Sequence, residues 1–291
     1  MTEDFLGVQS TQTLATTLER ADAGRSYTAT RTASGQLGAL GLSERARAIA
    51  RAILADVDGD RDRLSRVIRA SLEEGTFGGW TLWPLGLAAS WSAIEADTDA
   101  AFDTGMEHLR SLTPRMSSEF SIRPLLLHNL DRGLWHLREW TNDPNWHVRR
   151  LASEGSRPLL PWGERLPALV RDPAPTLPIL DALYADPEES VRRSVANHLN
   201  DHSRGHADVV VSTVRGWQAA GGTDVERTVR HALRTLVKRG NVDALDVLGF
   251  SPAEVDVTPV MLSADIVPVG GDVRFSASVR NVDDRPAKLV I

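Results

Sequence analysis

A phrase of thirteen residues occurs twice in this chain and constrains its fold more than any other feature. Residues 143–155 read DPNWHVRRLASEG and residues 186–198 read DPEESVRRSVANH, an offset of 43. A weaker third copy, DVERTVRHALRTL, begins 38 residues further on, at Asp224. A period of about 40 residues with helical patterning is typical of stacked helical hairpins of the HEAT kind. We therefore predict an all-α, HEAT-like helical-repeat solenoid over residues 41–250.

The two ends of the chain differ from the repeat region in composition and in hydrophobic pattern. Residues 1–40 are rich in Thr, Ser, Gly and Ala with little periodicity, and we expect them to be loosely ordered and loop-rich. Residues 251–291 alternate β-branched and polar residues around a Gly-Gly turn, as the first strands of a β-sandwich do. The pattern stops in mid-strand, and a few strands do not make a sandwich alone. We therefore expect an incomplete β segment after the solenoid.

The charge of the chain is unevenly distributed. The net charge is −6, yet residues 113–240 hold 18 Lys and Arg against 15 Asp and Glu. Of those 18 cations, 17 are arginine, whose planar guanidinium suits phosphate. The repeat region is thus a candidate nucleic-acid surface, although arginine is also preferred over lysine in the rest of the chain. The chain has no cysteine, which excludes disulfides and thiolate chemistry. Without a signal peptide or long apolar run, we expect a cytoplasmic protein with no membrane contact.

The repeated phrase predicts one apolar and one polar helical face. Apolar residues recur at i, i+3 and i+4, as they do on the buried side of a helix. Arg150 and Glu154 lie one turn apart on the opposite face, and the next copy continues this column with Arg193, Asn197 and Asp201. These polar residues either converge on a ligand or form ordinary surface pairs, which contribute only about 0.2–0.5 kcal/mol each. The residues predicted to be buried between helix layers are Val148, Leu151, Val191, Val195 and Val229.

Two further features have more than one interpretation. Trp162 lies in a proline-interrupted loop, where its indole could stack on a sugar or base, or fasten the loop to the protein. His198, His202 and His206 recur every four residues, a spacing that permits a metal site. No HExxH pattern and no cysteine accompany them, so we expect solvated or phosphate-facing histidines and no metal.

Several long phrases resemble the AlkC family, HEAT-like DNA glycosylases related to AlkD. They are WP (83–84), SSEFSIRP (117–124), HVRRLASEGSRPLLPW (147–162), DPEESVRRSVANHLND (186–201) and RHALRTLVKRG (230–240). The resemblance covers roughly residues 75–250, and the C-terminal stretch is similar to the start of the Ig-like domain of many AlkC proteins. It implies excision of cationic N3-methylated bases, 3-methyladenine foremost and 3-methylcytosine in some members, from alkylated double-stranded DNA. It also implies catalysis without base flipping and without a cofactor.

Matching the family's motifs to this sequence gives the candidate site residues. The resemblance implies catalytic roles for Glu119, Glu154, Trp162 and Asp201, with Arg150 close by. The cations that we expect to contact DNA are Arg149, Arg150, Arg157, Arg192, Arg193, Arg230 and Lys238. We expect a monomer. The alternative is a non-catalytic HEAT-repeat scaffold that binds DNA or protein, which would have no use for carboxylates converging in one cleft. A hydrolase acting on another substrate is disfavoured because no nucleophile–base pair is visible.

Overall fold

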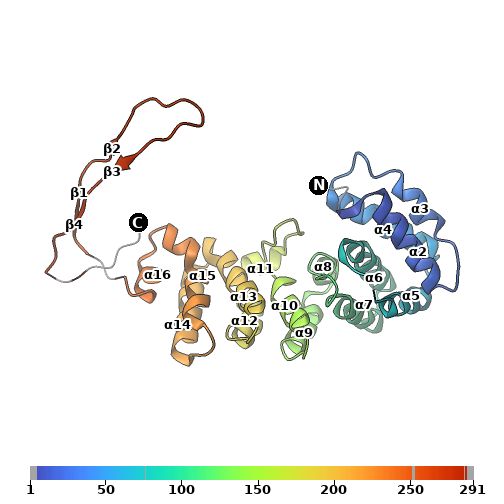
Figure 1. Cartoon of the computed structure of the whole chain (residues 1–291). Coiled ribbons are helices and arrows are strands. Elements are labelled where there is room, and N and C mark those ends of the chain that lie inside the picture. The colour runs from blue at the N-terminus through green and yellow to red at the C-terminus, as the bar shows by residue number, and fades with distance from the viewer. Residues whose placement is uncertain (1–4, 76, 251–252, 285, 287–291) are drawn as a thin grey trace.

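The computed structural model describes residues 5–75, 77–250, 253–284 and 286. Its helices follow one another in a single row, and a long β-hairpin rises from the far end (Figure 1). The helices of the N-terminal half are α2 (Val8–Ala21), α3 (Thr28–Ser34), α4 (Leu42–Asp56), α5 (Arg61–Glu73), the 3₁₀ turn η1 (Gly79–Thr81), α6 (Leu82–Ala96), α7 (Asp99–Leu112) and α8 (Arg123–His128). Those of the C-terminal half are α9 (Leu130–Trp140), α10 (Trp146–Glu154), α11 (Pro167–Arg171), η2 (Ala174–Thr176), α12 (Leu177–Leu183), α13 (Glu189–Asp201), η3 (His202–Arg204), α14 (Ala207–Ala220), α15 (Val225–Lys238) and α16 (Val242–Val247).

The repeated phrase forms the second helix of three consecutive helix pairs. These pairs are α9 with α10, α12 with α13, and α14 with α15. Helix α10 packs against α13, and α13 packs against α15, so the second helices form one continuous layer. The first helices lie in a second layer, in which α9 contacts α12. The predicted all-α helical-repeat fold is confirmed.

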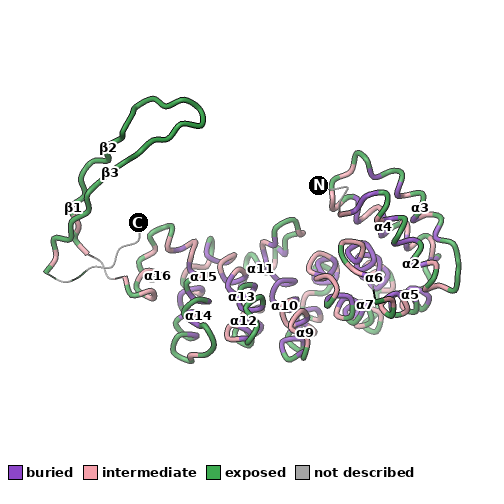
Figure 2. The backbone as a smooth tube through the Cα atoms, viewed as in Figure 1, coloured by how far each residue is buried: buried purple, intermediate pink, exposed green. Residues whose placement is uncertain are grey.

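The hydrophobic core extends along the whole series of stacked helices. One hydrophobic cluster extends from Leu6 to Leu112, and a second extends from Ala93 to Ala244. Figure 2 shows buried stretches along the helices of both halves, whereas the hairpin is exposed. The apolar face predicted from the repeats is buried as expected, at Val148, Leu151, Val191, Val195 and Val229.

The N-terminal segment differs from the prediction, because residues 8–21 and 28–34 are helical. Helix α2 buries Leu14, Ala15 and Leu18 and packs against α3 and α5. The threonine hydroxyls of α2 hydrogen-bond within the helix, as Thr13 Oγ1 does to the carbonyl of Gln9 at 3.0 Å. The apolar stripe is too short to give a clear period, and packing against neighbouring helices determines the structure instead. The interpretation of residues 1–40 as loop-rich was therefore wrong.

Successive repeats are joined by a ladder of arginine–aspartate ion pairs. Arg149 binds Asp186 of the next repeat through two hydrogen bonds of 2.6 and 3.0 Å. Arg110 binds Asp143 at 2.7 Å and Arg192 binds Asp224 at 2.6 Å, in each case through one oxygen of the aspartate. Each bond therefore connects an arginine of one repeat to the aspartate that opens the following one.

Two of these arginines, Arg149 and Arg192, also fix the turn that precedes their own helix. The Nη1 of Arg149 donates to the carbonyls of Asp143 and Pro144, at 2.9 and 3.2 Å. Arg192 repeats both contacts with the equivalent Asp-Pro turn, at 2.6 and 2.8 Å. The Asp-Pro and the first arginine of the repeated phrase thus recur because they form one hydrogen-bonded unit.

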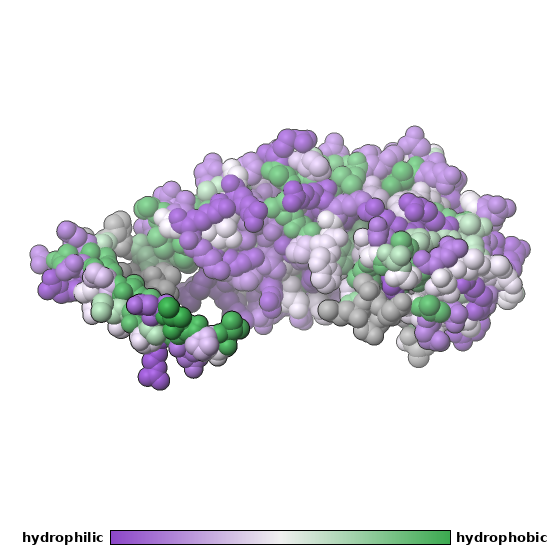
Figure 3. Space-filling model, turned by 90° about the horizontal axis from the view of Figure 1, so that it is seen from above, coloured by the Kyte–Doolittle hydropathy of each residue, from purple (hydrophilic) through white to green (hydrophobic). Residues whose placement is uncertain are grey.

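The C-terminal strands form one long antiparallel hairpin. Its strands are β1 (Val255–Val257), β2 (Met261–Leu262), β3 (Phe275–Ser276) and β4 (Val279–Asn281), in which β1 pairs with β4 and β2 pairs with β3. Between the pairs Val257–Val279 and Met261–Ser276 one strand has one residue more than the other, so the hairpin contains a β-bulge. Hydrophobic colouring follows the hairpin when the molecule is seen from above (Figure 3). Its assignment to an Ig-like domain stays a prediction. In the described ranges, no helix is both long and apolar enough to cross a membrane.

We predict that the ladder stabilises the fold. The Arg149 and Asp186 side chains are 14% and 4% exposed, so Asp186→Ala leaves a buried guanidinium without its carboxylate. The expected loss in the free energy of unfolding is about 3 kcal/mol, measured by urea denaturation. The control is Asp246→Ala, which breaks the 3.1 Å pair with Arg215, where both side chains are more than half exposed. This pair should contribute less than about 1 kcal/mol, and equal losses for the two variants would contradict the role of the ladder.

Candidate active site

Five charged side chains form a continuous row along the second-helix layer. Glu119 accepts a hydrogen bond from Arg150 at 2.9 Å, and Arg150 lies 3.7 Å from Glu154. Glu154 accepts from Arg157 at 2.7 Å. Arg157 then binds both oxygens of Asp201, at 2.9 and 3.1 Å. The structure therefore brings together the three carboxylates that the sequence selected, with two arginines between them.

The helical geometry explains how residues distant in sequence meet in this row. Arg150 and Glu154 are one turn apart in α10, and Arg157 follows three residues beyond its end. Asp201 is the last residue of α13, which packs directly on α10. Glu119 lies in the turn before α8. The row thus crosses three successive helical units, and its geometry depends on their stacking.

The row carries an excess of negative charge in a poorly solvated place. Glu154, Arg157 and Asp201 are all buried or nearly so. Burial raises the pKa of the Asp201 carboxyl above its ordinary value, and this effect outweighs the hydrogen bonds from Arg157. Burial alone would lower the pKa of Arg157, but the hydrogen bond to Asp201 and the charge of Glu154 raise it instead. With all groups ionised, the row itself has three carboxylates and two guanidiniums.

The loop between α10 and α11 presents Trp162 next to this row. Arg123, which is fully buried, donates hydrogen bonds to the carbonyls of Gly155 at 2.9 Å and Arg157 at 2.7 Å. It also donates to the carbonyl of Glu164 at 2.7 Å, so one side chain fixes both ends of the loop. Burial lowers the pKa of Arg123 to about 10, which still leaves it charged at neutral pH. The role of Arg123 could not be predicted from the sequence, because nothing in a lone arginine before a proline distinguishes a buried anchor from a surface charge.

Trp162 itself is 76% exposed and has a positive φ of 64°. A non-glycine residue pays about 1–2 kcal/mol for this left-handed conformation, so the surrounding loop must impose it. Its indole lines a groove of about 780 Å³ together with Arg157 and Asp201. It also lines a second groove, of about 380 Å³, which contains Trp83 and Phe120. The high exposure of Trp162 favours the interpretation that its indole stacks on a ligand over the interpretation that it fastens the loop.

The three histidines do not lie where the sequence predicted. His198 and His202 are buried rather than solvated, and His198 Nδ1 hydrogen-bonds the carbonyl of Ser153 at 2.9 Å. Burial lowers the pKa of His202 to about 4 and that of His198 well below its ordinary value, so both are neutral. Only His206 is partly exposed. The prediction failed because α13 is covered on this side by α10 and by its own continuation into η3. Among the described residues, no group of three or more His, Asp or Glu is arranged to hold a metal ion.

The predicted DNA-contacting cations divide into two groups. Arg149, Arg157 and Arg192 are bound to carboxylates and shielded from solvent, so we correct their assignment to the DNA surface. The first arginine of each repeated pair belongs to the ladder. Arg150 is partly exposed within the row. The cations left exposed at the surface are Arg193, Arg230 and Lys238.

The arrangement of helices is similar to that of a solved DNA-repair enzyme. The structure of Pseudomonas fluorescens alkylpurine DNA glycosylase AlkC, bound to DNA containing an abasic site analog, matches this chain with a TM-score of 0.74. The two chains are 31% identical, and the match covers 97% of this chain and 76% of the other. The chain belongs to the AlkC family. No protein-family model matches it.

The chain is also similar in sequence to a second bacterial protein. The uncharacterized protein YhaZ of Bacillus subtilis strain 168 is 36% identical over 191 residues. The matched part is 65% of this chain and 53% of YhaZ, so it spans about half the length of that relative.

We predict that the left-handed conformation of Trp162 weakens the fold. Trp162→Gly should be more stable to urea than Trp162→Ala by about 1 kcal/mol, because glycine adopts a positive φ without a steric penalty. The matched control is Trp135, an exposed tryptophan inside α9. There the order should reverse, with alanine about 1 kcal/mol more stable than glycine. The same order at both positions would show that the loop imposes no strain.

Proposed function

We propose that this chain is a DNA glycosylase that removes cationic N3-alkylated bases from double-stranded DNA. The bases are 3-methyladenine first and 3-methylcytosine second, and the reaction is hydrolysis of the N-glycosidic bond in the repair of alkylation damage. The observation that carries the proposal is the row of three carboxylates with two arginines, next to an exposed tryptophan. The similarity to an AlkC enzyme bound to abasic DNA supports it.

The chemistry of these lesions matches a site with excess negative charge. A methylated base that is already cationic is a good leaving group and needs no general acid. Departure of the base leaves an oxocarbenium-like deoxyribose, whose positive charge develops at C1′. Carboxylates fixed beforehand near that atom stabilise the transition state most where solvent screens them least, as around the buried Glu154. Arg150 and Arg157 keep the carboxylates close together in spite of their mutual repulsion.

Asp201 is the best candidate to activate the attacking water. Its carboxylate lies in the groove that Trp162 also lines. Because burial raises its pKa, the ionised form is a stronger base than an ordinary aspartate. Its oxygens are oriented by the two hydrogen bonds from Arg157. We assign Asp201 the role of general base and Glu119 and Glu154 the role of electrostatic stabilisation.

The exposed indole suits contact with DNA without extrusion of the damaged base. Trp162 projects from the loop and can place its face against the sugar or the cationic base, an attraction of about 0.5–2 kcal/mol. An enzyme that does not enclose the base cannot examine its edges closely, so it selects lesions by charge. The exposed cations Arg193, Arg230 and Lys238, together with Arg150, are the side chains that we assign to the backbone phosphates.

We predict release of cationic bases only. Incubated with a duplex carrying several lesions, the purified chain should release 3-methyladenine and 3-methylcytosine, detected by mass spectrometry. It should leave uracil and hypoxanthine in place, because these neutral bases need protonation to depart. Efficient release of either neutral base would refute selection by charge, and no release of any base would favour the scaffold alternative.

We predict that Glu154→Gln slows excision without unfolding the protein. Glutamine keeps the shape and the hydrogen bond from Arg157 but removes the charge, and loss of one such stabiliser typically lowers the rate about 10²–10³-fold. The rate is measured as single-turnover release of 3-methyladenine, with circular dichroism to verify folding. Glu139→Gln, an exposed position on α9, is the control and should leave the rate unchanged. An unchanged rate in Glu154→Gln would remove Glu154 from the mechanism.

A further inference from the structure

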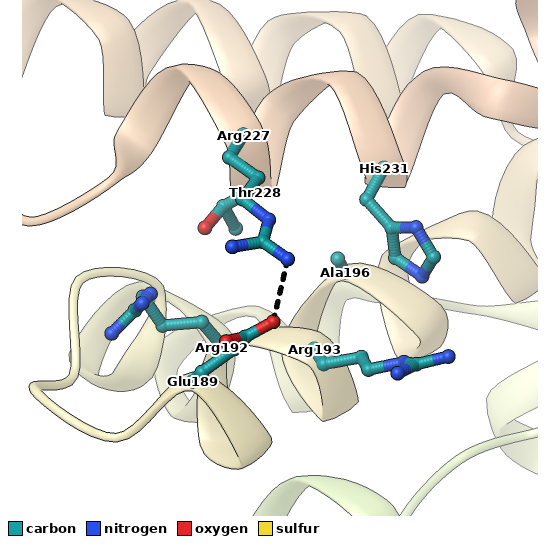
Figure 4. Close-up of a pocket in the computed structure, with 7 residues that line it drawn as sticks. All are labelled: Glu189, Arg192, Arg193, Ala196, Arg227, Thr228 and His231. Atoms are coloured by element: carbon teal, nitrogen blue, oxygen red, sulfur yellow. Dashed lines mark ion pairs between the residues drawn. The ribbon is translucent and has the colours of Figure 1, made fainter.

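A second charged groove lies between α13 and α15, one repeat beyond the row. It has a volume of about 270 Å³ and lies between Arg193 and Glu189 of α13 and Arg227 and His231 of α15. Figure 4 shows Arg227 reaching across the groove toward Glu189, with Arg193 and His231 at its other end and the small Ala196 between them. Small side chains at the helix contact leave room for a ligand between the long cationic ones.

The repeat explains why this groove is positively charged. Arg193 occupies the position that Arg150 holds one repeat earlier, and Asn197 replaces Glu154. The charge of Arg150 is therefore compensated by carboxylates, whereas Arg193 is exposed and has no ion-pair partner in the described part of the chain. The Nε2 of His231 donates a hydrogen bond to the Oδ1 of Asn197 at 2.9 Å.

The Glu189 carboxylate of this groove is bound only weakly by Arg227. Arg227 and Glu189 form an ion pair of 2.7 Å, with side chains that are 70% and 56% exposed. Exposed pairs of this kind contribute only about 0–1 kcal/mol. By contrast, the neighbouring Arg192 is buried and bound to Asp224 and to two backbone carbonyls. Arg227 can thus exchange its partner, and Arg192 cannot.

The pKa of His231 reflects the positive charges that surround it. Burial lowers the pKa of His231, and the positive charges of Arg234, Arg193 and Arg227 lower it further. The groove is therefore electropositive even with the Glu189 carboxylate in place. A phosphate is the anion best matched to the guanidiniums that line this groove, because its oxygens accept charge-assisted hydrogen bonds.

We propose that this groove binds a backbone phosphate of the DNA whose lesion is held at the row, and that Glu189 occupies the place of that phosphate until DNA binds. The inference rests on the proposed function for the identity of the anion. Arg193 and Arg227 grip the phosphate, and the Glu189 carboxylate moves away into solvent. Glu189 then weakens binding to any DNA, since its ion pair with Arg227 must be broken first.

The test is the affinity for a fluorescein-labelled undamaged duplex, measured by anisotropy over a range of salt concentrations. Glu189→Gln should bind up to about 5-fold more tightly, the equivalent of an exposed ion pair. Arg193→Gln and Arg227→Gln should each bind more weakly and reduce the log–log salt slope by about 0.9, the loss of one phosphate contact. The control is Glu95→Gln, which changes the net charge equally at an exposed position on α6 and should leave affinity unchanged. All four side chains are exposed, so these variants should fold.

Two results would overturn the proposal: equal affinities of the Glu189 and Glu95 variants, or an unchanged salt slope in both arginine variants. Release of 3-methyladenine by the same preparations separates this proposal from the proposed function. A chain that excises the base but shows no Glu189 effect retains the function and loses the phosphate site. A chain that binds DNA in a Glu189-dependent manner without excising the base retains the phosphate site and loses the function.

Discussion

The arginine–aspartate ladder is the interaction on which the rest of the structure depends. In a solenoid each repeat contacts only its neighbours, so stability and curvature are set at the junctions. Arg149 and Arg192 join three things at once: the turn before their own helix, the helix itself, and the aspartate of the next repeat. Apolar packing between helices is nondirectional and permits sliding. The directional arginine–aspartate hydrogen bonds specify the register at which α10, α13 and α15 stack.

That register is what assembles the candidate site. Arg157 follows α10 and Asp201 ends α13, so their two hydrogen bonds exist only when these helices are correctly aligned. The two adjacent arginines of the repeat have different roles. The first faces the junction and binds the aspartate of the next repeat. The second, Arg150 or Arg193, faces outward from the second-helix layer. A single repeated motif thus provides both the scaffold and the ligand-facing charge.

The balance of charge changes along this outward face. Around Arg150 carboxylates exceed guanidiniums, which suits a developing cation at a sugar carbon. One repeat further on, Asn197 replaces the carboxylate and the surface becomes cationic around Arg193 and Arg227. A negative site flanked by positive side chains is the arrangement expected for a reaction on a cationic base within a polyanion. The replacement of the glutamate by asparagine in the repeat contributes to that change.

The sequence by itself determined the repeat, the buried face with Val148 and Val191, and the set of carboxylates, because helical periodicity is local and family phrases are long. It did not reveal that α2 is a helix, since its few apolar residues acquire meaning only through packing on α3 and α5. Nor did it separate Arg149 from Arg150. Adjacent arginines look alike in a sequence, and only the stacked helices turned one toward Asp186 and the other toward Glu119. Burial of Arg123 and His198 was likewise decided by tertiary structure, because the fate of a polar side chain depends on which partners the fold brings to it.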